Sequence, residues 1–251
     1  MYSVLARAWG RQHWWPAHSR FEVIVGAFLT QNASWSNVEL ALRQLRSARA
    51  LCPGSIRNLP LPQLEQLIRS SGHFRQKAAR LKNFVRFLDQ NYGGSLARMF
   101  AQPTALLREQ LLSLNGVGPE TADAILLYAG QHPVFVVDAY TKRIAARHGI
   151  LPSNSSYEDV RGLFERALSQ DELPLENLRK SGGACHSPSR ISMMRRSRQS
   201  QIYNEMHALL VGVGKHYCLK SEPKCDACPL SPLLAQGKSP GIYGTKPARN
   251  A

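Results

Sequence analysis

The chain has 251 residues, of which 43% are hydrophobic, and its 32 Lys and Arg against 17 Asp and Glu give a formal net charge of +15. This length suits one large or two small globular domains, and the charge predicts a polyanionic partner such as DNA. No apolar signal-peptide core follows Met1, and no run of about 18 apolar residues occurs. We therefore expect a cytoplasmic protein with reduced thiols and no membrane partner.

Helical periodicity of apolar residues recurs along the chain, and Gly, Pro, Ser or Asn punctuates most of its ends. Alternating strand patterns are scarce, so we predict an all-α fold. The predicted helices span 21–30, 38–48, 61–70, 77–91, 104–114, 119–129, 140–148, 157–168 and 202–210.

Two aromatic residues and one amide stand out at the start of the chain. Trp14 and Trp15 precede the first predicted helix, where they are either core residues or stacking partners for a nucleobase. Gln31 lies where that helix gives way to a polar turn, and an amide that simply ends a helix has the same sequence pattern.

The most informative stretch is 114–122, Leu-Asn-Gly-Val-Gly-Pro-Glu-Thr-Ala. Gly116 and Gly118 flank Val117 and allow a tight turn, which leads into a helix whose first turn contains Glu120 and Thr121. Unpaired amides and the helix dipole favour an anion there. We predict that these five residues bind a DNA phosphate, although an isolated Gly-Val-Gly would equally fit an ordinary helix-turn-helix corner.

Asp138 follows the apolar run 133–137 and precedes the predicted helix 140–148. An aspartate at this point is a good N-cap, because it accepts hydrogen bonds from backbone N–H groups. The same carboxylate can stabilise an oxocarbenium-like state and activate water during cleavage of a glycosidic bond. The two roles are compatible, so we predict Asp138 as the catalytic residue.

Residues 114–126 and 135–141 together resemble the helix-hairpin-helix DNA glycosylase superfamily that includes endonuclease III. Segments 21–32, 71–78 and 207–228 are also similar to that family, so the resemblance spans about 14–230. It implies a six-helix barrel with the hairpin over 21–131, and a second helical domain built from 1–20 and 132–251. It also implies a DNA groove between them, with Asp138 at its edge and Gln31 entering the duplex where a nucleotide is extruded.

One position departs from the endonuclease III pattern. Members of the family that also cleave the strand carry a lysine two residues after the second hairpin glycine, and this chain has Glu120 there. A carboxylate cannot form an imine, so the resemblance implies a monofunctional enzyme that uses water. Capping its own helix is the favoured role of Glu120.

The tryptophan pair and residues 119–126 are most similar to the type III 3-methyladenine DNA glycosylase branch, whose N-terminal aromatic residues help to wall the base pocket. This resemblance implies an alkylated purine such as 3-methyladenine as the substrate. An electron-poor alkylated base stacks well on indole, and its positive charge makes it a good leaving group.

A basic segment at 179–200 interrupts the resemblance. It contains Gly182, Gly183, several serines and six basic residues but no acid, which predicts a disordered loop. The basic residues are Arg179, Lys180, Arg190, Arg195, Arg196 and Arg198. The loop either adds non-specific DNA affinity or is an insertion without function, and the tail after Gly237 is also expected to be flexible.

Cys218, Cys225 and Cys228 have a spacing typical of a metal or cluster site rather than of disulfides. The endonuclease III family carries a four-iron, four-sulfur (4Fe-4S) cluster on this loop, with a fourth cysteine where this chain has Leu234. Three interpretations remain: a cluster with another fourth ligand, a three-iron cluster, or a relic loop without metal. Zinc is disfavoured, because no His-x3–5-His pair follows.

The sequence therefore predicts a monomeric, monofunctional DNA glycosylase of base excision repair that acts on damaged bases in double-stranded DNA. One alternative is an endonuclease III-like glycosylase and AP lyase acting on oxidised pyrimidines through Lys142 or Lys215. Another is a non-catalytic DNA-binding protein that keeps the hairpin. Asp138 discriminates between these classes, because a pure binding protein does not need it.

Overall fold

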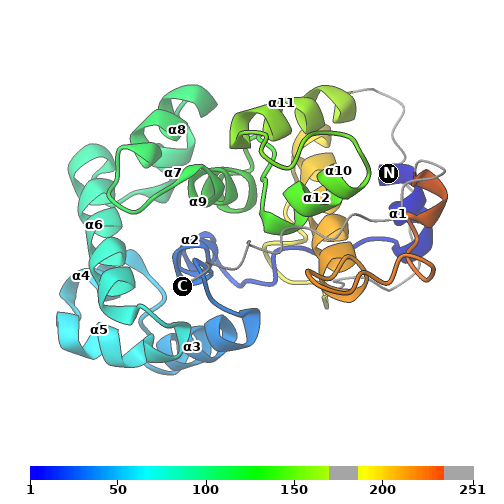
Figure 1. Ribbon diagram of the computed structural model, residues 1–251. Coiled ribbons are helices and arrows are strands. Elements are labelled where there is room, and N and C mark those ends of the chain that lie inside the picture. Colours follow the sequence, from blue (N-terminus) through cyan, green and yellow to red (C-terminus); the bar gives the residue numbers. More distant parts are fainter. Residues whose placement is uncertain (170–185, 235–251) are drawn as a thin grey trace, which may run out of the picture. The chain divides into compact units, whose positions relative to one another are not determined.

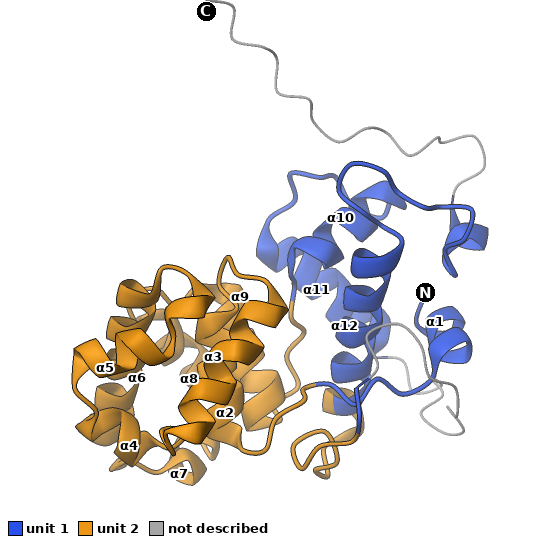
Figure 2. Cartoon of the chain, turned by 90° about the horizontal axis from the view of Figure 1, so that it is seen from below, with its two compact units in different colours: residues 1–14, 137–187, 201–251 blue, residues 15–136, 188–200 orange. Residues whose placement is uncertain are grey.

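The computed structural model describes residues 1–169 and 186–234. Helices account for the regular structure of these two ranges, which contain no strand, and the predicted all-α fold is confirmed (Figure 1). The chain forms two compact units, shown in Figure 2. Unit 2 comprises 15–136 and 188–200, and unit 1 comprises 1–14, 137–187 and 201–251.

Unit 2 is organised around helix α2. Its elements are α2 (Arg20–Leu29), α3 (Trp35–Ser47), α4 (Pro53–Asn58), α5 (Leu61–Leu67), η1 (Arg69–Ser71), α6 (Phe74–Tyr92), α7 (Leu96–Phe100), α8 (Thr104–Leu112), α9 (Pro119–Ala124) and the π-helical segment η2 (Ile125–Gly130). Helix α2 contacts α3, α6, α9 and η2, and all residues after its first are buried. The buried Glu22 carboxylate accepts a hydrogen bond from His18 N at 2.9 Å and pairs with Arg46, so the core contains no uncompensated charge at this point.

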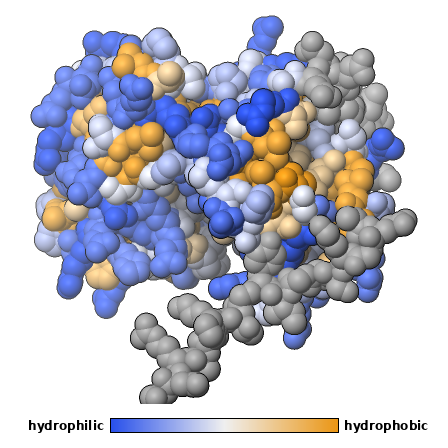
Figure 3. Space-filling view, turned by 45° about the horizontal axis from the view of Figure 1, so that its top comes forward, coloured by the Kyte–Doolittle hydropathy of each residue, from blue (hydrophilic) through white to orange (hydrophobic). Residues whose placement is uncertain are grey.

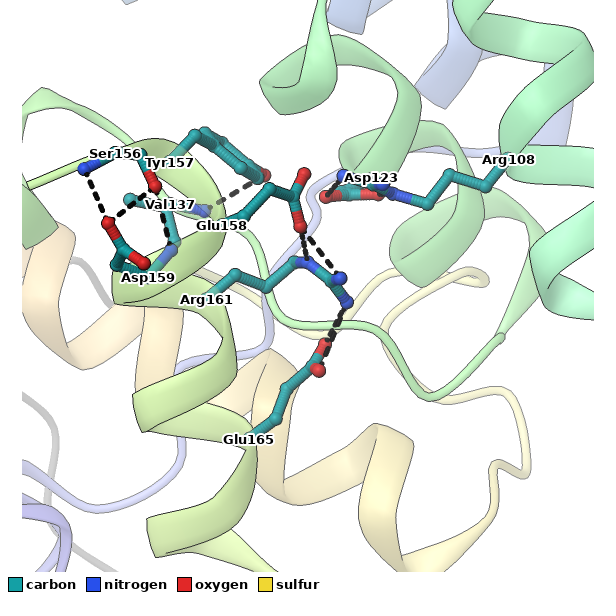
Figure 4. A network of polar contacts seen from close by, with 9 residues as sticks. All are labelled: Arg108, Asp123, Val137, Ser156, Tyr157, Glu158, Asp159, Arg161 and Glu165. Carbon is teal, nitrogen blue, oxygen red and sulfur yellow. Dashed lines mark hydrogen bonds and ion pairs between the residues drawn. The ribbon is translucent and has the colours of Figure 1, made fainter.

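Unit 1 contains the two ends of the chain. Its helices are α1 (Tyr2–Trp9), α10 (Ala139–Arg147), α11 (Tyr157–Leu168), α12 (Arg198–His216, from residue 201 on) and η3 (Ser231–Leu233). Ser156 and Asp159 form a capping box that starts α11, as Figure 4 shows. The adjacent Tyr157 hydroxyl accepts a hydrogen bond from Val137 N at 3.3 Å, which fixes the segment that leads into α10.

The predicted helices correspond to observed ones, with changes at the ends. Helix α11 has the predicted bounds, whereas α6 and α12 extend further in both directions. Helices α1, α4 and α7 were not predicted, since eight or fewer residues are too few to show a clear period. Across the residues that the structure describes, no helix combines the length and apolar character needed to cross a membrane.

Part of the segment predicted to be disordered is packed instead. Residues 179–185 and the tail after Gly237 lie outside the described residues. Ile191 and Ser192 are buried, and Ile191 N donates a hydrogen bond to Ala17 O at 3.3 Å. Arg196 Nη2 donates to Ile191 O at 2.9 Å. The prediction of disorder is therefore wrong for 186–200, because one apolar side chain and a set of local hydrogen bonds anchor a segment that composition alone marks as loop.

Polar residues cover much of the face drawn in Figure 3, and apolar residues gather there in separate patches.

Candidate functional site

The glycine hairpin of unit 2 joins α8 to α9. Gly116 has φ of +79°, a conformation that favours glycine, and Val117 N donates to Leu114 O at 3.0 Å. Val117 is buried, whereas Gly118 and Glu120 are exposed. Gly118 is the N-cap residue of α9, and Pro119 occupies its first position. The predicted turn is present, with its apolar residue in the core and its second glycine on the surface.

A buried ion pair clamps the two helices of this motif together. Arg108 on α8 donates from Nε to Asp123 Oδ1 at 2.7 Å and from Nη2 to Oδ2 at 3.1 Å (Figure 4). The Asp123 side chain on α9 is completely buried. This two-point contact fixes the relative direction of the helices, because a planar guanidinium pairs with a carboxylate in one preferred geometry.

Gln31 is attached to the hairpin from the end of α2. Its Nε2 donates to Gly116 O and to Thr121 Oγ1, both at 2.9 Å, and its Oε1 accepts from Arg80 Nη1 at 2.6 Å. Arg80 also covers Gly116, since a Cβ added there would lie 2.0 Å from Arg80 Nε. The structure thus brings Gln31, Gly116 and Thr121 together. The part played by Arg80 was missed, because the residue lies among other basic residues of α6.

Lys77 supports the same corner of unit 2. This buried lysine donates from Nζ to Leu29 O at 2.9 Å and to Ser71 O at 2.6 Å, so it ties the end of α2 to the loop before α6. Burial disfavours the charged form and lowers the pKa of Lys77 to about 8.

Asp138 is the N-cap residue of α10 in unit 1, as predicted from its position. Its Oδ1 accepts hydrogen bonds from Thr141 N at 2.7 Å and from Thr141 Oγ1 at 2.9 Å. The other oxygen, Oδ2, lies 3.7 Å from His207 Nε2 on α12. The Asp138 side chain is 14% exposed. One oxygen therefore caps the helix, and the second faces a histidine that sequence reasoning did not single out.

The surroundings of His207 are aromatic and polar. The Trp14 ring lies 6.5 Å from the His207 ring and 5.3 Å from that of His186, measured between centroids. Burial lowers the pKa of His207, although the charge of Asp138 acts in the opposite direction. One turn earlier on α12, the Asn204 side chain is fully buried, and neither atom of its amide finds a hydrogen-bond partner in the described part of the chain.

The two adjacent tryptophans pack against different rings. Trp14 belongs to unit 1, where it lies beside the histidine that faces Asp138. Trp15 belongs to unit 2 and packs against Tyr128 and Trp35, with ring centroids 5.2 and 5.5 Å apart. It also covers Gly26, where an added Cβ would lie 3.1 Å from the indole. Trp15 is therefore part of the packing of unit 2.

The cysteine loop is held by arginines of α10. Arg147 Nη1 donates to Cys218 Sγ at 3.2 Å and to Leu219 O at 2.6 Å, and Arg143 Nε donates to Cys218 O at 2.7 Å. Burial raises the pKa of Cys225 and of Cys228 and so favours their thiol forms. Among the side chains that the structure describes, no group of three or more His, Cys, Asp or Glu is arranged to hold a metal ion. The three cysteines alone do not complete the four-thiolate ligand set of a four-iron cluster, and we assign no chemical step to one.

Comparison with known proteins identifies the family. Residues 25–170 match the family model described as HhH-GPD superfamily base excision DNA repair protein. A Methanocaldococcus jannaschii protein, whose name describes it as a DNA repair glycosylase, is 40% identical over 232 residues, which are 92% of each chain. Endonuclease III of Bacillus subtilis is 23% identical over 87% of this chain and 82% of its own length.

Solved structures agree with the sequence relatives. The H. pylori 3-methyladenine DNA glycosylase bound to 1,N6-ethenoadenine is 28% identical, with a TM-score of 0.66 over 84% of this chain and 91% of its own. An endonuclease III–DNA complex has a TM-score of 0.67 and covers 94% of each chain at 23% identity, so it supports the fold. The chain belongs to the HhH-GPD superfamily of base excision DNA repair proteins, and it is a DNA glycosylase.

Proposed function

We propose that this DNA glycosylase is monofunctional and hydrolyses the N-glycosidic bond of an alkylated purine in double-stranded DNA, with Asp138 as its catalytic carboxylate. The observation that carries the proposal is that the two carboxylate oxygens of Asp138 have different contacts. Oδ1 is fixed by two hydrogen bonds from Thr141, so the carboxylate is anchored at the start of α10 and Oδ2 is left outside the cap. An oriented carboxylate is the group that oxocarbenium chemistry requires.

The reaction needs no covalent intermediate. A water molecule forms a bond to C1′ of the extruded nucleotide through its oxygen, while the C1′–N bond breaks and its electron pair leaves with the base. Asp138 Oδ2 accepts the proton of the water, and the negative charge of the carboxylate stabilises the positive sugar in the transition state. A purine that already carries an alkyl group and a positive charge departs as a neutral molecule, so no second acid is required.

Glu120 and the two candidate lysines support hydrolysis rather than attack by an amine. Glu120, at the position of the lysine in strand-cleaving relatives, is exposed on the first turn of α9 and cannot form an imine. Lys142 donates from Nζ to Ser155 O at 3.2 Å, so its amine is engaged by a backbone carbonyl. Lys215 lies on the exposed side of the last turn of α12.

Two observations support an alkylated purine as the substrate. The structural relative from H. pylori is a 3-methyladenine DNA glycosylase and was solved with a modified adenine. In this chain, Trp14 lies beside the histidine that faces Asp138, where an indole could stack on an electron-poor base. The hairpin residues Gly116, Val117, Gly118, Glu120 and Thr121 are the proposed phosphate contacts. Gln31 can enter the duplex only by exchanging its three hydrogen bonds to the hairpin region for contacts with DNA.

The test is release of free bases from methylated duplex DNA by the parent protein and by Asp138→Asn, with strand breaks scored before and after alkali. Asparagine caps a helix as well as aspartate does, so the variant keeps the start of α10. We expect release of alkylated purine by the parent, breaks only after alkali, and a rate about 100- to 1,000-fold lower for the variant.

Other outcomes have defined meanings. Breaks without alkali would show a lyase, and release of oxidised pyrimidines in place of alkylpurines would favour the alternative substrate. A parent that binds DNA as well as Asp138→Asn does and releases no base from any lesion would be a non-catalytic DNA-binding protein.

A further inference from the structure

The two oxygens of the Asp138 carboxylate have different surroundings. Oδ1 is occupied by Thr141 N and Thr141 Oγ1, both from the first turn of α10. Oδ2 is directed away from that turn, toward α12, where His207 Nε2 lies 3.7 Å away. A carboxylate fixed through one oxygen can still pivot about that contact, so its reactive oxygen needs a second constraint.

We propose that His207 is the positioning residue of Asp138, because its Nε2–H donates to Oδ2 and holds that oxygen toward the sugar of the extruded nucleotide. This inference rests on the proposed hydrolysis at Asp138. It assigns no bond-making step to His207, which acts through the carboxylate. Nε2 and Oδ2 lie 3.7 Å apart, so the proposal requires the carboxylate to approach the imidazole slightly, or one water molecule to bridge them, when substrate binds.

The environment of His207 suits this role. Burial lowers its pKa, so the imidazole is neutral near pH 7 even with a carboxylate beside it. A neutral donor orients Asp138 without cancelling the negative charge that the transition state needs. A cationic partner, such as an arginine in the same place, would neutralise that charge.

The imidazole is itself held in place. His207 is buried, and the Trp14 ring lies against it at 6.5 Å, tilted by 56°. Trp14 also lies 5.3 Å from the His186 ring. A positioning residue must be rigid, because a donor that moves cannot fix the group to which it donates.

A histidine that serves only for packing is the competing explanation, and two substitutions separate the two. His207→Gln places an amide N–H at about the reach of Nε2, whereas His207→Leu keeps an apolar side chain of similar size without a donor. The assay is steady-state release of alkylpurine from methylated duplex DNA at several DNA concentrations, which gives kcat and KM. Unfolding midpoints and affinity for uncleaved DNA are measured on the same samples.

We expect His207→Leu to lower kcat by about 10- to 100-fold, the value of one hydrogen bond to a charged group, with KM unchanged. His207→Gln should recover most of that loss. A packing role predicts the opposite pattern: lower unfolding midpoints for both variants, an unchanged kcat for each, and no advantage of Gln over Leu. That result would overturn the proposal.

A double-mutant cycle tests whether His207 acts through Asp138. If it does, adding His207→Leu to Asp138→Asn lowers kcat much less than it does in the parent background. Independent, multiplicative losses would contradict the proposal. A parent without base release overturns the proposed function and this inference together, whereas an active parent with an unchanged His207→Leu variant overturns the inference alone.

Discussion

The hairpin region of unit 2 and helix α12 of unit 1 differ in how completely selected polar side chains are hydrogen-bonded. Around the hairpin, Gln31, Lys77 and Arg108 each hydrogen-bond to specific partners within the unit. On α12, one turn before His207, the buried Asn204 amide has no hydrogen-bond partner among the described residues. Buried polar groups are normally satisfied, so the unpaired amide on α12 is an exception that the hairpin region does not show for these three side chains.

The largest expected effect concerns the clamp between α8 and α9. Arg108→Met removes the two-point partner of the fully buried Asp123 carboxylate. Removing one member of a buried pair leaves the other charge buried without that partner. We therefore expect the free energy of unfolding to fall by about 3–5 kcal/mol. Chemical denaturation of the two proteins measures this difference.

The matched control is Arg57→Met, which removes a guanidinium that also makes a two-point contact with a carboxylate. This pair lies at the surface, where the Arg57 side chain is 44% exposed and the Asp89 side chain 32% exposed. Water solvates both charges there, so we expect little change. Equal losses for the two variants would show that the hairpin clamp has no special value.

Lys77 gives the hairpin region a pH dependence with a defined sign. Its pKa is about 8 in the folded protein and 10.5 when unperturbed, so the unfolded chain binds more protons between these values. Stability from this lysine is therefore lowest below pH 8 and rises through that window. We expect a gain of about 2 kcal/mol between pH 7 and 9.5 relative to Lys77→Met.

The measurement is the difference between the two pH–stability curves, because tyrosines and cysteines titrate in the same window in both proteins. If the curves run parallel, Lys77 keeps an ordinary pKa, and its ammonium group at the end of α2 is solvated rather than buried.

The hairpin region illustrates how far the sequence alone reaches. The turn at Gly116, Val117 and Gly118 was predicted from the spacing of its two glycines. Gly116 has a φ of +79°, a conformation that favours glycine. The position of Asp138 at the start of a helix was predicted for the same reason. These features depend on neighbours within a few residues, and sequence patterns report such neighbours well.

Contacts between residues far apart in the sequence were not predicted. Arg80 meets Gln31 across 49 residues, and His207 faces Asp138 across α10 and α12. A lone histidine on an apolar helix face has no local signature, because packing histidines look the same. Trp14 and Trp15 are adjacent in the sequence, but their ring neighbours differ, which the sequence pattern does not specify.

A pair of amide substitutions tests the comparison directly. Gln31→Met removes hydrogen bonds to Gly116 O, Thr121 Oγ1 and Arg80, so we expect unfolding free energy to fall by about 1–2 kcal/mol. Asn204→Leu replaces a buried amide without described partners, so we expect a gain of about 1 kcal/mol. The two changes are similar in kind and opposite in sign.

Thermal and chemical unfolding of both variants provide the measurement, and alkylpurine release provides a second readout. A less stable Asn204→Leu variant would mean that the amide is satisfied in solution, and the contrast between the two regions would not hold. A more stable variant with slower release would show that the amide serves the bound base.

The smallest effect is expected at the oxygen of Asp138 that caps α10. Thr141→Val removes the Oγ1 hydrogen bond to Oδ1 and keeps the one from the backbone N–H, so we expect stability to fall by about 1 kcal/mol. Thr141→Ser, which retains a hydroxyl, should restore most of it. Because the backbone bond and His207 still hold the carboxylate, base release should slow by only about threefold, or 0.6 kcal/mol. A loss of base-release rate as large as that of His207→Leu would instead show that the Thr141 contacts alone orient the Asp138 carboxylate. In that case α10, without His207, would position the reactive oxygen.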